Sequence, residues 1–434
     1  SEGNISDLRM RLAPYYKRTL RKDVTEYINY TKRLPLTQKF DATDMEQELY
    51  NAVSEFLRRD DLYSVPRRQQ MLTTMIIRKI LASSTYALLG TLEAVKARLI
   101  KMLEDETTKQ MSIAEWLDTD EMGVLEDSED LESEFDVDEQ KINKIKLKDE
   151  IDTIQGFIDI AKQISCDSKA KSLLNALEKA FAQLPTLGAN RKALIFTEST
   201  RTQKYLKDFL EQNGYQGKIV LFNGSNSDKE SNAIYNAWAE QNTYTGRLSG
   251  IKAADRRAAL VDYFRDTAEI MIATEAAAEG LNLQFCSLVV NYDLPWNPQR
   301  IEQRIGRCHR YGQKSDVVVV NFINQRNFAD MRVFTLLSDK FNLFDDVFGA
   351  SDEILGKTDS VDFERRIWEI YQQCRTEDEI EAAFTKLQDD MQEEIEDRLD
   401  DVKQQVLENF DIDVQERLKL SKEKTSAFLN RYEY

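Results

Sequence analysis

Residues 288–320 read LVVNYDLPWNPQRIEQRIGRCHRYGQKSDVVVV and place two apolar runs, Leu288–Asn291 and Val317–Val320, on either side of a polar segment. The residues from Asn297 towards Tyr311 have a helical pattern, and asparagine is a residue type that caps helices. Runs that are apolar at nearly every position are typical of strands buried on both faces, as in parallel sheets covered by helices. The stretch therefore predicts a strand, a helix and a second, parallel strand.

The same pattern extends towards the N-terminus. Three further apolar runs occur, at Ala193–Phe196, Ile219–Phe222 and Ile270–Ala273, with helical segments after Ser199-Thr200 and around residues 254–264. Strands that alternate with helices in this way predict one doubly wound α/β domain, which we place at residues 189–325. Ligands of such sheets bind beyond the carboxyl ends of the strands. The polar residues at these ends are Thr197, Glu198, Asn223, Gly224, Thr274, Glu275 and Asp293.

Helical patterns flank this domain on both sides. Residues 1–100 show helical segments and no strand signal, and a helical pattern resumes over residues 141–188. Residues 326–434 are again helical, with Thr376 and Glu379 spaced as a capping box that opens a long helix. The apolar residues of that helix recur nearer to the ordinary helical period than to the coiled-coil repeat. We therefore expect a helix lying on a protein surface, with a dimerisation coil as the alternative.

The net charge of −18 arises mainly in two segments of the chain. Residues 104–139 contain 16 acidic residues and Lys109 as their one basic residue, and residues 362–434 contain 21 acidic and 11 basic residues. We expect residues 101–140 to form an acidic, disordered insertion, because this composition buries too little apolar surface to become ordered. An acidic mimic of DNA is the alternative. The acidic helical tail is a candidate surface for a protein partner, and the basic residues of 1–100 form either a solvated face or a contact to phosphates or a neighbouring domain.

The cysteine content and the hydropathy of the chain indicate its cellular compartment. The four cysteines are far apart and His309 is the single histidine, so neither a zinc site nor a disulfide scaffold is predicted. No apolar run approaches the roughly 18 residues of a membrane span. These observations predict a cytoplasmic protein with no membrane contact and no metal ligands of its own.

The segment Gln299–Gln313 carries the most specific chemistry. On a helix, Gln303, Arg307 and Arg310 fall at positions i, i+4 and i+7, which puts one amide and two guanidinium groups on one face. Arginine offers a rigid fork suited to phosphate oxygens, and an arginine pair aimed at a transferring phosphoryl group serves nucleotide hydrolysis. Pairing of these arginines with nearby carboxylates is the alternative that the spacing leaves open.

The end of this segment resembles a known motif. Residues 303–313, QRIGRCHRYGQ, resemble motif VI of superfamily-two helicases, and the Tyr-Gly-Gln ending is similar to that of the Swi/Snf-like DNA translocases. Residues 289–298 resemble the strand and turn that lead into motif VI, and residues 326–356 are similar to a bacterial branch of the family. The resemblance covers about residues 190–325 and implies a second RecA-like lobe.

Two upstream blocks support the resemblance. Residues 193–199, ALIFTES, resemble motif IV, and residues 270–284, IMIATEAAAEGLNLQ, resemble motif V. Thr274, Gly280 and Asn282 stand at the family's motif V positions. Glu275 and Glu279 replace the small or basic residues common there, which puts direct DNA contact at this block in doubt.

The resemblance implies a set of site residues for an intact enzyme that binds ATP and Mg²⁺ between two RecA-like lobes and moves along double-stranded DNA. Arg307 is then the expected arginine finger, with Arg310 and Gln303 as the other catalytic residues. The implied nucleotide contacts are Gly280, Asn282 and Arg304. The implied DNA contacts are Thr197, Ser199, Asn223, Gly224 and Thr274, with capping of the following helix as the alternative role of Thr197 and Ser199.

Two motifs of the family have no counterpart in the sequence. It contains no G-x-x-x-x-G-K-[ST] phosphate loop, and no aspartate-glutamate pair follows an apolar strand as a magnesium-holding motif would. In the family both lie on the first lobe, and residues 18–24 and 34–36 resemble the segment where that lobe ends. We therefore expect half of a motor, which needs the first RecA-like lobe of a longer parent protein and binds no cofactor tightly by itself. A chain that begins Ser1-Glu2-Gly3 without methionine agrees with this expectation.

Two further functional classes remain open at this point. One is a lobe of an RNA helicase, or the motor of a restriction or phage-defence complex, which shares the motifs and differs in substrate. The other is a non-catalytic interaction module whose acidic helices bind a partner.

Overall fold

The computed structural model describes residues 31–59, 61–65, 70–105, 143–274, 280–310, 312–339, 360–374 and 376–390. The chain divides into two compact units, residues 1–373 and 374–434. Most of the expected acidic insertion, Glu275 and Glu279 of the motif V block, and the tail beyond residue 390 lie outside the described residues.

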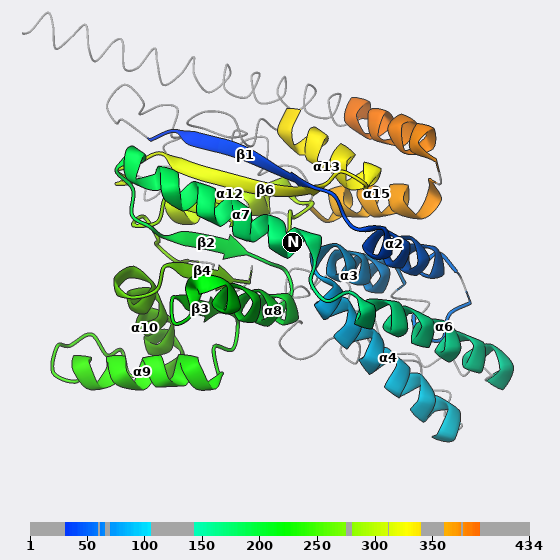
Figure 1. The fold of residues 1–434 in the computed structure, drawn as a ribbon, viewed down its shortest axis with the longest axis horizontal. Helices are drawn as coiled ribbons and strands as arrows, with labels where there is room; N and C mark the ends of the chain where they lie inside the picture. Colours follow the sequence, from blue (N-terminus) through cyan, green and yellow to red (C-terminus); the bar gives the residue numbers. More distant parts are fainter. Residues whose placement is uncertain are drawn as a thin grey trace, which may run out of the picture. The chain divides into compact units, whose positions relative to one another are not determined.

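A six-stranded parallel sheet with the strand order β1-β6-β5-β2-β4-β3 forms the centre of the first unit (Figure 1). The strands are β1 (Arg33–Phe40), β2 (Ala193–Phe196), β3 (Ile219–Phe222), β4 (Ile270–Ala273), β5 (Leu288–Asn291) and β6 (Val317–Asn324). The five strands predicted from apolar runs are confirmed, and β6 extends four residues beyond its predicted end at Val320.

Strand β1 corrects the expectation that residues 1–100 are helical without a strand. Its eight residues pair in parallel with β6, from Arg33 opposite Val317 to Phe40 opposite Asn324. It is an edge strand with a largely exposed central part, which explains its polar composition and why Pro35, which has no N–H to donate, is tolerated. A strand that buries so little of itself leaves no apolar run in the sequence.

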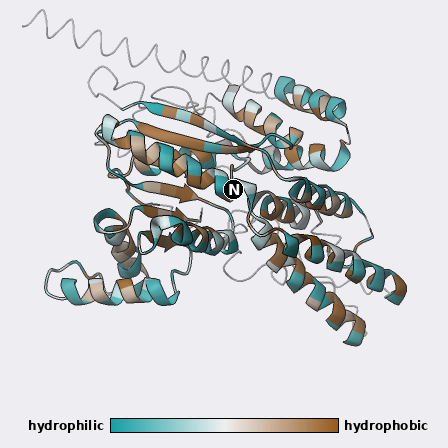
Figure 2. Cartoon of the chain, in the orientation of Figure 1, coloured by the Kyte–Doolittle hydropathy of each residue, from teal (hydrophilic) through white to brown (hydrophobic). Residues whose placement is uncertain are grey.

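Helices pack on both faces of the sheet. They are α7 (Ser168–Gln183), α8 (Thr200–Leu210), α10 (Lys252–Asp266), α12 (Pro298–Cys308) and α13 (Phe328–Asp339), with the short helical segments η5 (Leu184–Leu187) and η6 (Glu211–Tyr215). Helix α9 (Lys229–Asn242) packs against α10, where Trp238 donates a hydrogen bond to Asp262. Alternate strand residues such as Ala193 and Ile195 join α7 and α8 in one core cluster. On the opposite face, Phe196 lies against Arg304 of α12. The sheet is therefore doubly wound, as predicted, and Figure 2 shows its strands as mainly apolar.

A group of helices beyond the carboxyl ends of the strands has its own core. It consists of α2 (Asp44–Phe56), α3 (Gln70–Ser83), α4 (Thr85–Asp105) and α6 (Lys144–Gln163) (Figure 1). A capping box between Thr43 and Glu46 begins α2, and Phe56 packs edge-on against Phe157 at 5.5 Å between ring centroids. Helix α15 (Ser360–Gln373) packs on α3, where Trp368 donates a hydrogen bond to Thr74.

The described part of the second unit confirms the predicted capping box. The backbone N–H of Glu379 donates to the Thr376 hydroxyl at 3.3 Å, and the backbone N–H of Thr376 donates to the Glu379 carboxylate at 3.1 Å. Residues 377–390 are helical, and Phe384 and Leu387 are buried. None of the helices among the described residues is long and apolar enough to cross a membrane.

Glu150 of α6 connects the helical group to the segment that follows α2. Its buried carboxylate accepts hydrogen bonds from the backbone N–H groups of Tyr63 and Ser64, both at 2.8 Å. Because a Glu150→Leu substitution leaves two N–H groups without an acceptor, we expect it to lower the free energy of unfolding by about 2–5 kcal/mol. Glu150→Gln, which keeps one acceptor, should cost less. Urea unfolding measures both, with the exposed Glu93→Gln as the control, and equal stability of Glu150→Leu and the native chain would contradict the assignment.

Candidate functional site

Helix α12 has an inner face and an outer face. Ile301, Arg304, Ile305 and Cys308 are buried, which is the i, i+3, i+4, i+7 pattern of a helix packed on a sheet. Gln303 is exposed and Arg307 is half-buried on the other side of the helix. The helix predicted from Asn297 begins at Pro298, and Asn297 caps its first turn by accepting from the backbone N–H of Gln299. The predicted catalytic amide and the predicted finger therefore share the outer face.

The backbone orients both outer arginines. Nε of Arg307 donates to the carbonyl of Gln303 at 3.1 Å, and Nε of Arg310 donates to the carbonyl of Gly306 at 2.6 Å. Helix α12 ends at Cys308, so Arg310 lies beyond the helix and the predicted i+7 position does not apply to it. Its contact to Gly306 holds it over the last turn instead. In each case the contact of Nε with the backbone fixes the direction of the guanidinium group.

Arg304 has a different environment from the other predicted nucleotide contacts. Its side chain is 1% exposed, and it donates to the backbone carbonyl of Asp293 at 2.5 Å and lies 3.9 Å from the Glu198 carboxylate. A direct contact with nucleotide would require these interactions to break. The spacing of the apolar residues of α12 already places residue 304 on the inner face. The burial of Arg304 could therefore have been predicted from the sequence.

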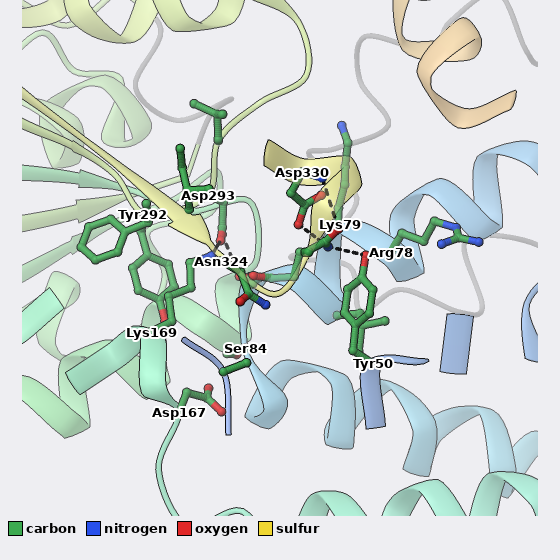
Figure 3. Close-up of a pocket in the computed structure, with 18 of the residues that line it drawn as sticks. Tyr50, Arg78, Lys79, Ser84, Asp167, Lys169, Tyr292, Asp293, Asn324 and Asp330 are labelled. Atoms are coloured by element: carbon green, nitrogen blue, oxygen red, sulfur yellow. Dashed lines mark hydrogen bonds and ion pairs between the residues drawn. The ribbon is translucent and has the colours of Figure 1, made fainter. Parts of the chain in front are cut away.

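The carboxylate of Asp293 is the centre of a buried polar cluster. Its Oδ2 accepts from the hydroxyls of Thr197 at 2.6 Å and Ser83 at 2.7 Å, and from the backbone N–H of Glu198 at 3.0 Å. Its Oδ1 pairs with Nζ of Lys169 at 2.7 Å (Figure 3). Burial alone would raise the pKa of Asp293, but Lys169 and the donated hydrogen bonds lower it below the usual value. The cluster joins β5 and β2 to α3 and α7.

A cavity of about 130 Å³ lies beside this cluster. The residues at the carboxyl ends of β1, β6, β5 and β2 line one side of it, and α2, α3, α13 and α15 line the others. Lys79 lies between Glu198, at 3.7 Å, and Glu364, at 3.3 Å. Burial raises the pKa of Glu198, against the opposing effect of Lys79 and Arg304. The edge of the sheet where ligands of α/β proteins bind is thus largely covered by helices here.

Three of the predicted DNA contacts have partners inside the chain. Thr197 donates to Asp293, Ser199 accepts from the backbone N–H of Thr202 and caps α8, and Asn223 bonds to Gln203 and to the backbone N–H of Asn226. All three side chains are buried. A direct phosphate contact would require them to exchange these partners, and Ser199 takes the capping role that was the alternative.

The remaining predicted contacts differ in exposure. Gly224, Gly280 and Asn282 are exposed, whereas Thr274 is buried just after β4. Gly280 has a φ of 74°, a backbone conformation that favours glycine. The backbone N–H of Leu283 donates to the carbonyl of Arg307 at 2.9 Å, which brings the end of the motif V block onto the end of α12.

Ser83 and Lys169 belong to the cluster and were not predicted from the sequence. Ser83 ends α3 and Lys169 lies in the first turn of α7, and each reads locally as an ordinary polar helix residue. Their partner Asp293 was recognised as a strand-end residue. The sequence carries no signal for the pairing, because Ser83 lies 210 residues from Asp293.

Comparison with known proteins assigns the domain. Residues 172–312 match the model for the helicase conserved C-terminal domain. The chain is 35% identical over 249 residues to the uncharacterized ATP-dependent helicase YqhH of Bacillus subtilis, which covers 57% of this chain and 38% of that protein. It is 27% identical over 175 residues to the helicase-like transcription factor of Oryctolagus cuniculus, covering 37% and 15%. It is 36% identical over 94 residues to the ATP-dependent RNA helicase eIF4A of Scheffersomyces stipitis, covering 22% and 23%.

These matches show which class of protein the chain is similar to. Residues 172–312, which include β2, β3, β4, β5 and α12, are similar to the helicase conserved C-terminal domain. The three relatives are named as two ATP-dependent helicases and a helicase-like transcription factor. The chain spans well under half the length of each of these relatives.

Asp167, which precedes α7, offers a test of the electrostatics beside the cavity. Burial raises its pKa to about 6, although it accepts a hydrogen bond from the backbone N–H of Thr85. A carboxyl with a raised pKa costs stability above that pKa, and the cost falls as the pH drops through 6. We therefore expect Asp167→Asn to be more stable than the native chain, by up to about 3 kcal/mol at pH 8.

The gain from Asp167→Asn should shrink by about half between pH 8 and pH 5. Urea unfolding at the two pH values measures it, and Asp159→Asn on the exposed side of α6 is the control. A gain that does not change with pH would show that Asp167 does not titrate in this range.

Proposed function

We propose that the chain is the second motor lobe of an ATP-dependent DNA translocase. It supplies the motif VI arginines to an ATP molecule held by a first RecA-like lobe of the same parent protein. The observation that carries this proposal is the geometry of α12, whose inner face is fixed by Arg304 and apolar residues while Gln303 and Arg307 face outward.

The outer face of α12 has the chemistry that phosphoryl transfer needs. Charge develops on the oxygens of the transferring phosphoryl group, and a preorganised guanidinium stabilises it without having to reorganise. The contacts of Arg307 to Gln303 and of Arg310 to Gly306 provide this preorganisation. Arg307 is the proposed finger, Arg310 the second cation, and Gln303 the amide that positions water or phosphate. The exposed backbone at Gly280 and the side chain of Asn282 are the proposed nucleotide contacts nearby.

Arg304 acts as a positioning residue in this proposal. Its bonds to Asp293 and Glu198 attach α12 to the carboxyl ends of β5 and β2. The arginines of the outer face are thereby held relative to the sheet.

The chain offers residues suited to the phosphates of ATP, but its described residues offer no site for Mg²⁺. The guanidinium groups of Arg307 and Arg310 suit phosphate oxygens. Among the described residues no group of three or more side chains is arranged to hold a metal ion. In the intact enzyme Mg²⁺ neutralises phosphate charge, and we assign its ligands to the first lobe.

Duplex DNA is the proposed substrate. The support for DNA is the Swi/Snf-like sequence of motif VI and the similarity to a helicase-like transcription factor. With Thr197, Ser199 and Asn223 engaged inside the chain, the proposed phosphate contacts fall to the exposed loop at Gly224 and to Thr274. Similarity to an RNA helicase keeps RNA as the competing substrate.

Substitution of Arg307 tests the motor function. In the full-length protein that carries this chain, we expect Arg307→Ala to lower ATP turnover by about 10³ or more, because the finger stabilises charge that develops only in the transition state. ATP hydrolysis is measured at saturating ATP with and without duplex DNA. Arg191→Ala, at the opposite ends of the strands, is the control and should keep native turnover. Native turnover by Arg307→Ala would contradict the proposal. If RNA stimulates ATP hydrolysis and duplex DNA does not, the substrate is RNA and not duplex DNA.

Separation of the lobes gives a second test. The 434-residue chain by itself should hydrolyse no ATP, because its sequence has no phosphate loop. Phosphate release by the purified chain, compared with the full-length protein, is the measurement. Turnover by the chain at the rate of the full-length protein would show that it is a complete enzyme.

A further inference from the structure

Arg33, the first residue of β1, contacts the helix that carries the proposed finger. Its Nη1 and Nη2 lie 2.6 and 2.9 Å from the two carboxylate oxygens of Glu302, and its Nε donates to Nδ1 of His309 at 3.2 Å. The side chain of Arg33 is 1% exposed and that of Glu302 is 19% exposed. This is a bidentate ion pair extended by a third hydrogen bond, the strongest geometry available to an arginine.

The contacts of Arg33 lie on either side of Arg307 in the sequence. Glu302 precedes Arg307 by five residues, about 7.5 Å along the helix axis, and His309 follows it by two. One guanidinium therefore contacts the middle of α12, at Glu302, and the residue that follows its end, His309. Contacts at these two positions oppose rotation of the helix about its axis, and such a rotation would change the direction of Arg307.

The backbone of the two residues before Arg33 is also attached to this region. Because Arg33 donates to Nδ1 of His309, the imidazole carries its proton on Nε2, which lies 2.6 Å from the carbonyl of Thr31. The backbone N–H of Lys32 donates to Asp316 at 2.8 Å, and its carbonyl accepts from the backbone N–H of Val317. Each of residues 31–33 thus has a contact with this region: Thr31 with His309, Lys32 with the start of β6, and Arg33 with Glu302 and His309.

We propose that Arg33 is a positioning residue for ATP hydrolysis, which sets the orientation of Arg307 and Arg310 through Glu302 and His309. The inference rests on the proposed function. It adds that the segment entering this lobe at β1 is coupled directly to the arginine helix. A displacement of residues 31–33 would move the arginines away from the phosphates without any change in the residues that bind ATP.

The test uses Arg33→Met in the full-length protein. Methionine fills the space of the side-chain stem and removes the charge and the fork. We expect kcat to fall by about 10- to 100-fold, the effect of misplacing a catalytic group by about 1 Å, while KM for ATP changes by less than about threefold. Binding of ADP with aluminium fluoride, which mimics the transferring phosphoryl group, should weaken by the same factor as kcat, and binding of ADP alone should not.

Three further variants separate positioning from stability. Arg33→Lys keeps a cation beside Glu302 without the fork and should recover part of kcat. Arg326→Ala removes an arginine that bonds to Ala42 and Asp44 just past the other end of β1, so it loosens the same strand at a distance from α12 and should keep native kcat. Glu302→Gln removes the charge and keeps one acceptor, and it replaces Arg33→Met if that variant does not fold.

The outcomes distinguish this inference from the proposed function. Loss of kcat in Arg33→Met, with no additional loss when Arg33→Met is combined with Arg307→Ala, supports it, because Arg33 then acts only through the group that Arg307→Ala has already removed. Native kcat in Arg33→Met, when Arg307→Ala is inactive, overturns the positioning role alone. Native kcat in Arg307→Ala overturns the proposed function and this inference together.

Discussion

The buried carboxylate of Asp293 is the interaction on which the remainder of the first unit depends. A carboxylate removed from water is stable only when cations and donors surround it, and Asp293 has one ammonium, two hydroxyls and a backbone N–H as partners. These partners come from α7, β2 and α3, so satisfying one charge also fixes the helices against the sheet. The backbone carbonyl of the same residue accepts from Arg304, which extends the arrangement to α12.

This cluster determines where the lobe can act on a ligand. Polar residues at the strand ends of the parallel sheet, where α/β proteins bind ligands, are here bonded within the chain, and Thr197, which donates to Asp293, is an example. Among the described residues, Gln303 on the outer face of α12 and the loops at Gly224 and Gly280 are exposed. We therefore propose two separate roles. The polar residues at the strand ends stabilise the fold, and the arginines on the outer face of α12 contact the phosphates of ATP.

The arginines of this lobe illustrate how environment assigns a role to one residue type. Arg33 and Arg304 are buried and contact the carboxylates of Glu302 and Glu198, respectively. We propose that they position helix α12. Arg307 and Arg310 use Nε to bond to the backbone of the preceding turn, and they are only half-buried. The sequence motif contains Arg304, Arg307 and Arg310 without distinguishing them, and the distinction comes from the phase of α12 on the sheet.

Local patterns in the sequence determined the five central strands, the caps at Asn297 and Ser199, and the motif VI helix, because burial on both faces and capping depend on residues close together in the chain. The sequence could also have placed Arg304 inward from the period of its apolar neighbours. Only the tertiary structure decided that Arg33–Phe40 is a strand, that Asp293 meets Ser83 and Lys169, and that Arg33 meets Glu302. The physical reason is separation: the partners Arg33 and Glu302 are 269 residues apart, and a polar contact over that distance leaves no periodic trace in the sequence.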